Sequence, residues 1–158
     1  MPQDKITIEQ FTASADEGHR QFVFDLHDLL MQSGCVLTIE DKSSGLFASY
    51  KRGKPSRALF NLGFKKSKMF ARIYGENTKK YPDLFDDMPQ EMVDAIAKSG
   101  DCKKMVGGNC GLKCTGYDVT IGGGRYQKCK YGCFTFTLTD ASKPCIMAFV
   151  RLELDARD

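Results

Sequence analysis

The sequence predicts an α+β fold, in which an antiparallel β-meander packs against two or three helices and a cysteine-rich loop follows near the C-terminus. Three observations lead to this prediction. Between residues 35 and 74, short apolar runs rich in aromatic residues alternate with turn residues, as in a meander. On either side of that stretch, apolar residues recur at the spacing of amphipathic helices. Five of the seven cysteines then gather between residues 102 and 133.

The N-terminal part predicts an extended start and then a helix. The chain before residue 14 favours a short edge strand or an arm, because Ile6 and Ile8 alternate with polar residues. Residues 14–34 favour a helix, since Ser14 and Glu17 have the spacing of a capping box. This helix also has an apolar stripe and a terminating glycine, formed by Phe22, Leu26, Leu29, Leu30 and Gly34.

Four strands follow in the predicted meander, over residues 35–40, 46–52, 56–64 and 69–74. Basic side chains collect at its turns and edges, namely Lys51, Arg52, Lys54, Arg57, Lys65, Lys66 and Lys68. Residues 42–80 carry eleven basic side chains and one acidic side chain, whereas the segments on both sides are acidic. This alternation predicts either a self-complementary surface or a basic face that meets an anion.

The remaining elements are helical, apart from two stretches of strand. Residues 76–100 predict one or two helices, with Pro89 in a first turn and an apolar stripe of Met92 and Ile96. A hairpin turn is expected at residues 122–124, with Cys129 opening the strand that follows. A further strand is expected over residues 133–138. Residues 142–156 favour a C-terminal helix through Ile146, Phe149 and Val150, although Val150, Leu152 and Leu154 also fit a strand.

Length and composition predict one domain over residues 1–158. Its parts are a helix–sheet–helix core over 14–100, a cysteine-rich loop with strands over 101–138, and the C-terminal helix. The chain has no run of about 18 apolar residues and no visible secretory signal, so we expect no membrane partner and a cytoplasmic location. Structural disulfides are rare in that compartment, and the odd number of cysteines also argues against them.

The clustered cysteines predict a zinc site. Zinc in structural sites takes four thiolate or imidazole ligands in a tetrahedron, with sulfur at about 2.3 Å. We expect the ligands to be Cys102, Cys110, Cys114 and Cys129, with Cys133 as a substitute for one of them. Nearby glycines let the backbone turn sharply enough for neighbouring thiols to converge. An iron–sulfur cluster, unligated thiols and disulfides remain open alternatives for the same residues.

This layout resembles a family of small bacterial YdhG-like α+β domains that are followed by a cysteine-rich loop. The segment "YPDLFDDMPQEMVDAI" and the later "GGGRYQKC" carry the resemblance, and it extends over residues 15–155. In that family, cysteines precede a turn and an aromatic strand, and one cysteine follows it. The resemblance implies an α+β fold and a zinc site, and it brings no activity with it.

The resulting functional prediction is a non-catalytic binding or sensing domain, stapled by one structural zinc, whose partner is a small molecule or a protein. One alternative is a nucleic-acid-binding module that uses the basic sheet over residues 42–80, where aromatic and basic residues interleave. That alternative is not favoured, because the core requires most of these aromatics and no recognition motif is present. The other alternative is a thiol-redox protein that uses Cys110–Cys114 or Cys129–Cys133.

Overall fold

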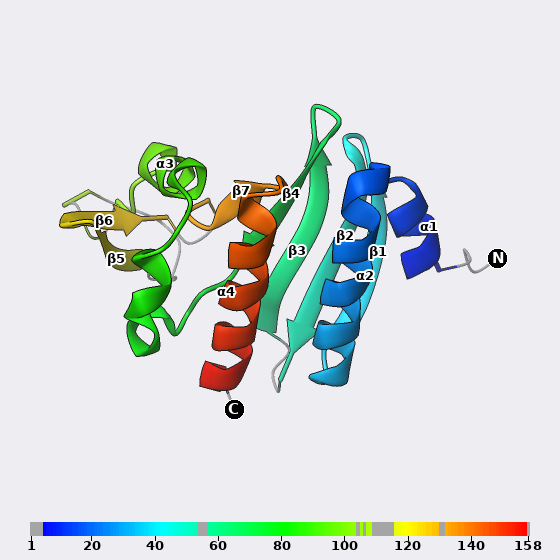
Figure 1. Cartoon of the computed structure of the whole chain (residues 1–158), viewed down its shortest axis with the longest axis horizontal. Helices are drawn as coiled ribbons and strands as arrows, with labels where there is room; N and C mark the ends of the chain where they lie inside the picture. The colour runs from blue at the N-terminus through cyan, green and yellow to red at the C-terminus, as the bar shows by residue number, and fades with distance from the viewer. Residues whose placement is uncertain are drawn as a thin grey trace. The chain divides into compact units, whose positions relative to one another are not determined.

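The computed structural model describes residues 5–53, 57–103, 105, 107–108, 116–129 and 132–157. The predicted α+β fold is confirmed: a five-stranded antiparallel sheet has the order β1-β2-β3-β4-β7, and β5 and β6 form a separate hairpin (Figure 1). In chain order the elements are α1 (Ile8–Ala13), α2 (Glu17–Gln32), β1 (Val36–Lys42), β2 (Gly45–Arg52), β3 (Arg57–Lys65), β4 (Lys68–Ile73), η1 (Thr78–Lys80), η2 (Pro82–Phe85), α3 (Gln90–Lys98), β5 (Tyr117–Ile121), β6 (Gly124–Lys128), β7 (Thr135–Thr137) and α4 (Ser142–Arg157).

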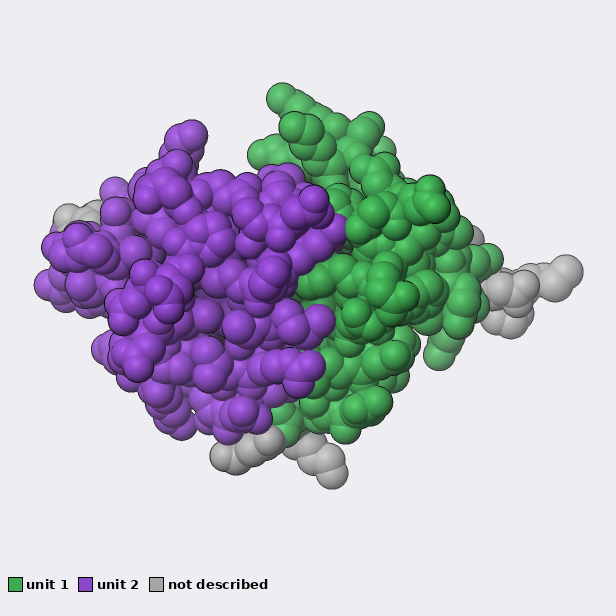
Figure 2. All heavy atoms as spheres, viewed as in Figure 1, with its two compact units in different colours: residues 1–71 green, residues 72–158 purple. Residues whose placement is uncertain are grey.

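The chain forms two compact units, Met1–Ala71 and Arg72–Asp158, which Figure 2 shows in green and purple. The boundary falls inside strand β4. A single domain over residues 1–158 stays a prediction. Among the described residues, no helix combines the length and the apolar character needed to span a membrane.

The prediction of a strand or arm at the N-terminus is wrong, because residues 8–13 form helix α1. Thr7 caps this helix: its hydroxyl accepts a hydrogen bond from the Gln10 backbone N–H, and the Gln10 side chain accepts one from the Thr7 N–H. This reciprocal pair is a capping box, which satisfies donors that the first helical turn leaves without partners. Phe11 is fully buried and anchors α1 in the core of the first unit.

Helix α2 begins later than predicted, at Glu17, and Ser14 does not cap it. Ser14 belongs instead to the end of α1, where its hydroxyl donates to the Phe11 carbonyl oxygen. The C-terminal end is as predicted: Gly34 has φ +88°, and the Cys35 N–H donates to the Leu30 carbonyl oxygen. This is the Schellman arrangement, in which a left-handed residue ends the helix. The fully buried residues of α2 are Val23, Leu26 and Leu30, so Val23 takes the place expected for Phe22.

The sheet of the first unit has one face packed against helices. Tyr50 on β2 is fully buried, and its hydroxyl lies 3.0 Å from Nδ1 of His27 on α2. Ala48 and Leu62, directly opposite each other on β2 and β3, are buried on the same face. The turn between β3 and β4 consists of Lys66 and Ser67, both with positive φ, as a two-residue hairpin turn requires.

The second unit is built around the aromatic side chain of Phe134. Its ring stacks on Tyr117 at 4.6 Å between centroids and meets Phe149 of α4 edge-on at 5.0 Å. The C-terminal helix is confirmed as α4, while the predicted helical stretch 76–100 consists of the short 3₁₀ turns η1 and η2 and then α3. Pro82 and Pro89 separate these pieces, because each lacks the N–H that a continuous helix needs.

Candidate functional site

Three of the five clustered cysteines lie in the described part of the second unit. Cys102, Cys129 and Cys133 carry thiols there, as does Cys145 on α4, and Cys35 carries a thiol in the first unit. The two other predicted ligands, Cys110 and Cys114, lie outside the described residues. The structure therefore describes half of the predicted ligand set.

Cys102 and Cys129 belong to neighbouring backbone segments. Asp101 and Lys128 form an antiparallel bridge, with the Cys102 N–H donating to the Gln127 carbonyl at 2.9 Å and the Cys129 N–H donating to the Gly100 carbonyl at 2.7 Å. Side chains alternate between the two sides of such a bridge, so both thiols are expected on the side opposite Asp101 and Lys128. Cys129 directly follows β6 instead of opening a strand as predicted.

A third segment reaches the Cys102 thiol at Gly116. A Cβ atom built on Gly116 would lie 2.8 Å from Cys102 Sγ and would also collide with the Lys128 carbonyl oxygen. Only glycine permits this close approach. The chain therefore returns from its cysteine-rich stretch directly beside Cys102, and in the sequence Cys114 precedes Gly116 by two residues.

Cys133 has a different environment. Its N–H donates to the Cys129 carbonyl oxygen at 3.0 Å, and its side chain is fully buried. Burial raises the pKa of the Cys133 thiol to about 12, while the Lys128 charge lowers that pKa and the neighbouring Cys129 raises it. A thiol with so high a pKa carries almost no thiolate at neutral pH, so Cys133 behaves as a small core residue and not as a nucleophile.

The described residues alone contain no group of three or more His, Cys, Asp or Glu side chains that could hold a metal ion. What they do contain fits part of a thiolate site: two thiols on adjoining segments, and a glycine where a third segment touches one of them. Thiolate ligands suit zinc and iron–sulfur clusters better than hard cations such as Mg²⁺.

Lys128, which precedes Cys129 in the sequence, connects the end of α3 to this region. Its ammonium group donates to the carbonyl oxygens of Ala97 and Ser99, both at 3.1 Å, and pairs with Asp101 at 2.7 Å. Ala97 and Ser99 lie at the C-terminal end of α3, where carbonyl oxygens lack intrahelical partners. Lys128 thus attaches the end of α3 to the bridge that carries Cys102 and Cys129.

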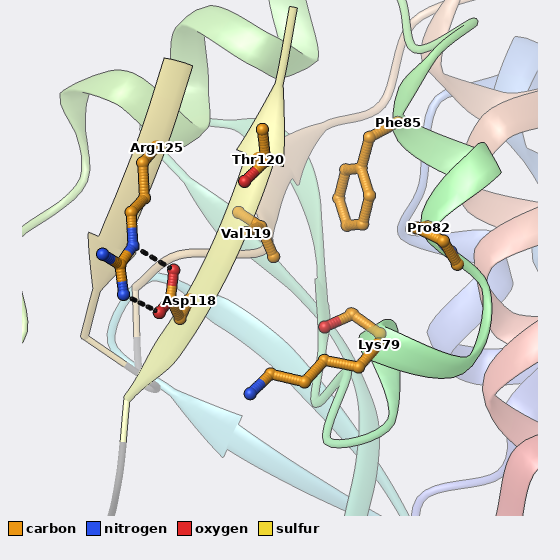
Figure 3. A pocket seen from close by; sticks show the side chains of 8 residues that line it. Lys79, Pro82, Phe85, Asp118, Val119, Thr120 and Arg125 are labelled. Carbon is orange, nitrogen blue, oxygen red and sulfur yellow. Dashed lines mark hydrogen bonds and ion pairs between the residues drawn. The ribbon is translucent and has the colours of Figure 1, made fainter. Parts of the chain in front are cut away.

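The second unit also contains two adjoining hollows, of about 390 and 450 Å³, which share Thr78, Lys79 and Asp118. Volumes of this size are typical of small-molecule sites. In Figure 3, Lys79, Pro82 and Phe85 form one wall of the first hollow, and strands β5 and β6 form the other.

A charged pair lies on the strand side of this hollow. Arg125 donates two hydrogen bonds to Asp118, from Nε at 3.1 Å and from NH2 at 2.6 Å (Figure 3). These bonds, and then the charges of Arg125 and Lys79, hold the pKa of the Asp118 carboxyl below its usual range. Asp118 is therefore ionised at neutral pH, and its charge is matched by Arg125.

A buried carboxylate fixes the segment that carries Thr78 and Lys79. Glu153 on α4 is fully buried and accepts hydrogen bonds from the backbone N–H of Asn77 at 3.1 Å, the Asn77 amide at 2.8 Å and the Tyr81 hydroxyl. Arg157 balances its charge, with Nε 2.7 Å from the carboxylate. Because Tyr81 is buried with Glu153 while Asn77 and Arg157 are half-buried, this network restrains both ends of η1.

Tyr117, which lines the second hollow, has a buried hydroxyl with no hydrogen-bond partner among the described residues. Burial raises the pKa of this phenol, followed by the charges of Glu76, Cys133 and Glu153, so it stays protonated at neutral pH. Tyr117, Glu153 and the Asp118–Arg125 pair were not predicted from the sequence. The alternation of Asp118 and Thr120 with Val119 and Ile121 is nevertheless typical of a strand with one polar side.

Comparison with protein-family models, with curated proteins and with solved structures gives no match. The resemblance to YdhG-like domains therefore stays a prediction.

Proposed function

We propose that this protein is a small non-catalytic binding domain in which one zinc ion, held by Cys102, Cys110, Cys114 and Cys129, staples the cysteine-rich segment of the second unit. The observation that carries the proposal is the meeting of three backbone segments at Cys102. Covalent geometry strengthens it, since two residues span at most about 7 Å and Cys114 is two residues from Gly116.

The proposed zinc is structural. With four thiolates, the metal has no open position for water, so it contributes folding free energy and no chemistry. Cys133 is left out of the ligand set because its side chain is fully buried among the core residues of the second unit. We also propose a cytoplasmic location, because a reducing compartment keeps thiols available to the metal.

The binding function is assigned to the two hollows beside β5. Lys79 is an exposed cation that lines both hollows, Thr78 also lines both, and Phe85 lines the first hollow. A ligand with an acidic group and an apolar body would satisfy this combination. The Glu153 network supports the proposal, because it holds η1 and so the position of Lys79.

Elemental analysis of the purified protein tests the zinc proposal. We expect about one zinc ion per chain, and loss of that zinc in Cys102→Ser and Cys129→Ser. Cys145→Ser is the matched control, because Cys145 lies on α4 and not in the cysteine-rich segment. Iron in place of zinc, or a metal-free protein whose seven cysteines all react with a thiol reagent after unfolding in denaturant, would overturn the proposal.

A further inference from the structure

A second surface, on the first unit, combines aromatic rings with lysines. Phe47 on β2 and Phe70 on β4 are half-buried, and their ring centroids lie 6.4 Å apart. Gly63 on β3 lies between them: a Cβ atom there would be 2.8 Å from Phe47 and 3.0 Å from Phe70. Because Gly63 has no side chain, the two rings can approach each other across strand β3.

These rings lie on the sheet face that α1 and α2 do not cover. Tyr50, which bonds to His27 of α2, is three residues from Phe47 on the same strand, so the two side chains point to opposite faces. Phe11 of α1 contacts Phe64, which is adjacent to Gly63 and likewise points away from the Phe47 side.

Lysines form the next row on this face. Lys42 and Lys65 lie two residues after Glu40 and Gly63 on β1 and β3, and Lys68 lies two residues before Phe70 on β4. Side chains two residues apart on a strand share a face, so the three lysines are on the same face as the two rings. All three are exposed, and the turns beside them lie at one end of the sheet (Figure 1).

Charge on this end of the face is strongly positive. The one carboxylate in the same rows is Glu40, which lies directly opposite Phe47 and 3.7 Å from the Lys42 ammonium group. Lys42 also lies over the Phe47 ring, 4.3 Å from its centroid, so this ring already accepts a cation. A π-face beside several ammonium groups matches a chain of alternating planar bases and phosphates.

We propose that this face of the sheet binds single-stranded nucleic acid, with bases stacked on Phe47 and Phe70 and phosphates on Lys42, Lys65 and Lys68. A base that stacks on Phe47 displaces the Lys42 ammonium group from the ring toward the neighbouring phosphate. The proposal is independent of the zinc site, which lies in the other unit.

Fluorescence anisotropy with short labelled oligothymidylate and oligouridylate tests this proposal. At low ionic strength we expect both single strands to bind more tightly than a duplex of the same length; the tighter of the two identifies DNA or RNA as the preferred strand. Phe47→Leu and Phe70→Leu should each weaken binding roughly 5- to 150-fold, the range that base–aromatic stacking supplies. Phe22→Leu is the control, because Phe22 is a half-buried aromatic on α2.

The lysines have a separate signature. Replacing Lys42, Lys65 and Lys68 together with glutamine should make the negative slope of log affinity against log salt shallower by about 2, since each phosphate contact on a single strand contributes about −0.7 to that slope. Lys98→Gln, on α3, should leave the slope unchanged.

Two results would overturn the proposal. One is the absence of single-strand binding by the folded protein at low salt. The other is equal binding of duplex, heparin and single strands with no effect of the phenylalanine variants, because that pattern indicates non-specific attraction of polyanions. If Cys102→Ser still binds the single-stranded oligonucleotides, the nucleic-acid proposal is supported even where the zinc proposal fails.

Discussion

Removal of the Glu153 carboxylate is the substitution with the largest expected effect on stability. Glu153 is fully buried and serves three donor groups on the 77–81 segment, as well as Arg157. In Glu153→Ala the buried Tyr81 hydroxyl and the half-buried donors of Asn77 lose this acceptor, and Arg157 loses its nearest carboxylate. Removing one partner of a buried ion pair typically costs about 3–5 kcal/mol, and each hydrogen bond to a charged group contributes about 1.5–3 kcal/mol, though not additively.

We therefore expect Glu153→Ala to lose about 3–5 kcal/mol of unfolding free energy, a large part of the about 5–15 kcal/mol that a domain has. The unfolding free energy of Glu153→Gln should lie between those of Glu153→Ala and the wild type. The glutamine amide keeps one acceptor oxygen, but its NH₂ group faces a donor. Urea denaturation followed by circular dichroism measures both changes.

Asp155→Asn is the matched control, because Asp155 lies on the same helix and is exposed. Its effect should stay within about 0.5 kcal/mol, as for most surface substitutions. If Glu153→Ala proved as stable as Asp155→Asn, the network would not hold η1, and the assignment of Lys79 to a fixed ligand site would fail with it.

Three further substitutions test other parts of the structure. Burial raises the pKa of the Tyr50 phenol above its ordinary value of 10.0, so the folded state keeps a proton that the unfolded state loses. Urea midpoints should therefore fall as pH rises above about 10, and less steeply in Tyr50→Phe. Gly116→Ala should lose about 1–3 kcal/mol and bound zinc together, because its Cβ meets Cys102 Sγ and the Lys128 carbonyl. Lys128→Met should lose about 2–3 kcal/mol in the same urea assay, because two carbonyls at the end of α3 lose their donor.

Each of these predictions has a result that would contradict it, and two of the substitutions have a control in the same chain. An equally steep fall of the urea midpoint with pH in Tyr50→Phe would contradict the burial argument. Gly18→Ala should not destabilise, since a Cβ there has nothing within 4 Å. If Gly116→Ala also kept its stability and its zinc, the close approach at Cys102 would be refuted. Lys98 lies in the last turn of α3 and is exposed, so Lys98→Met should cost far less than Lys128→Met.

The fold class could be predicted from the sequence because its signals are local. Gly34 ends α2, the turn residues separate four strands, and the apolar spacing from Ile146 onward gives α4. The error at α1 has an equally local cause, since the Thr7–Gln10 capping box starts a helix there and outweighs the short Ile6–Ile8 alternation.

The candidate site depends on contacts that no local pattern reveals. The Tyr81–Glu153 hydrogen bond joins residues 72 positions apart, and the Asn77–Glu153 bond joins residues 76 positions apart. In the sequence, Glu153 is one more acidic residue in an amphipathic helix. The cysteine cluster, by contrast, is visible from the positions of the cysteines in the sequence. The close approach of Gly116 to Cys102 is visible only in the folded chain.

X-ray absorption spectroscopy at the zinc edge tests the central claim most directly. Thiolate sulfur and imidazole nitrogen or carboxylate oxygen differ in zinc distance, at about 2.3 Å against about 2.0–2.2 Å. We predict four sulfur scatterers at about 2.3 Å in the wild-type protein, with one replaced by a lighter atom in any Cys102→Ser protein that retains zinc. A spectrum dominated by nitrogen or oxygen scatterers in the wild type would contradict the four-cysteine site.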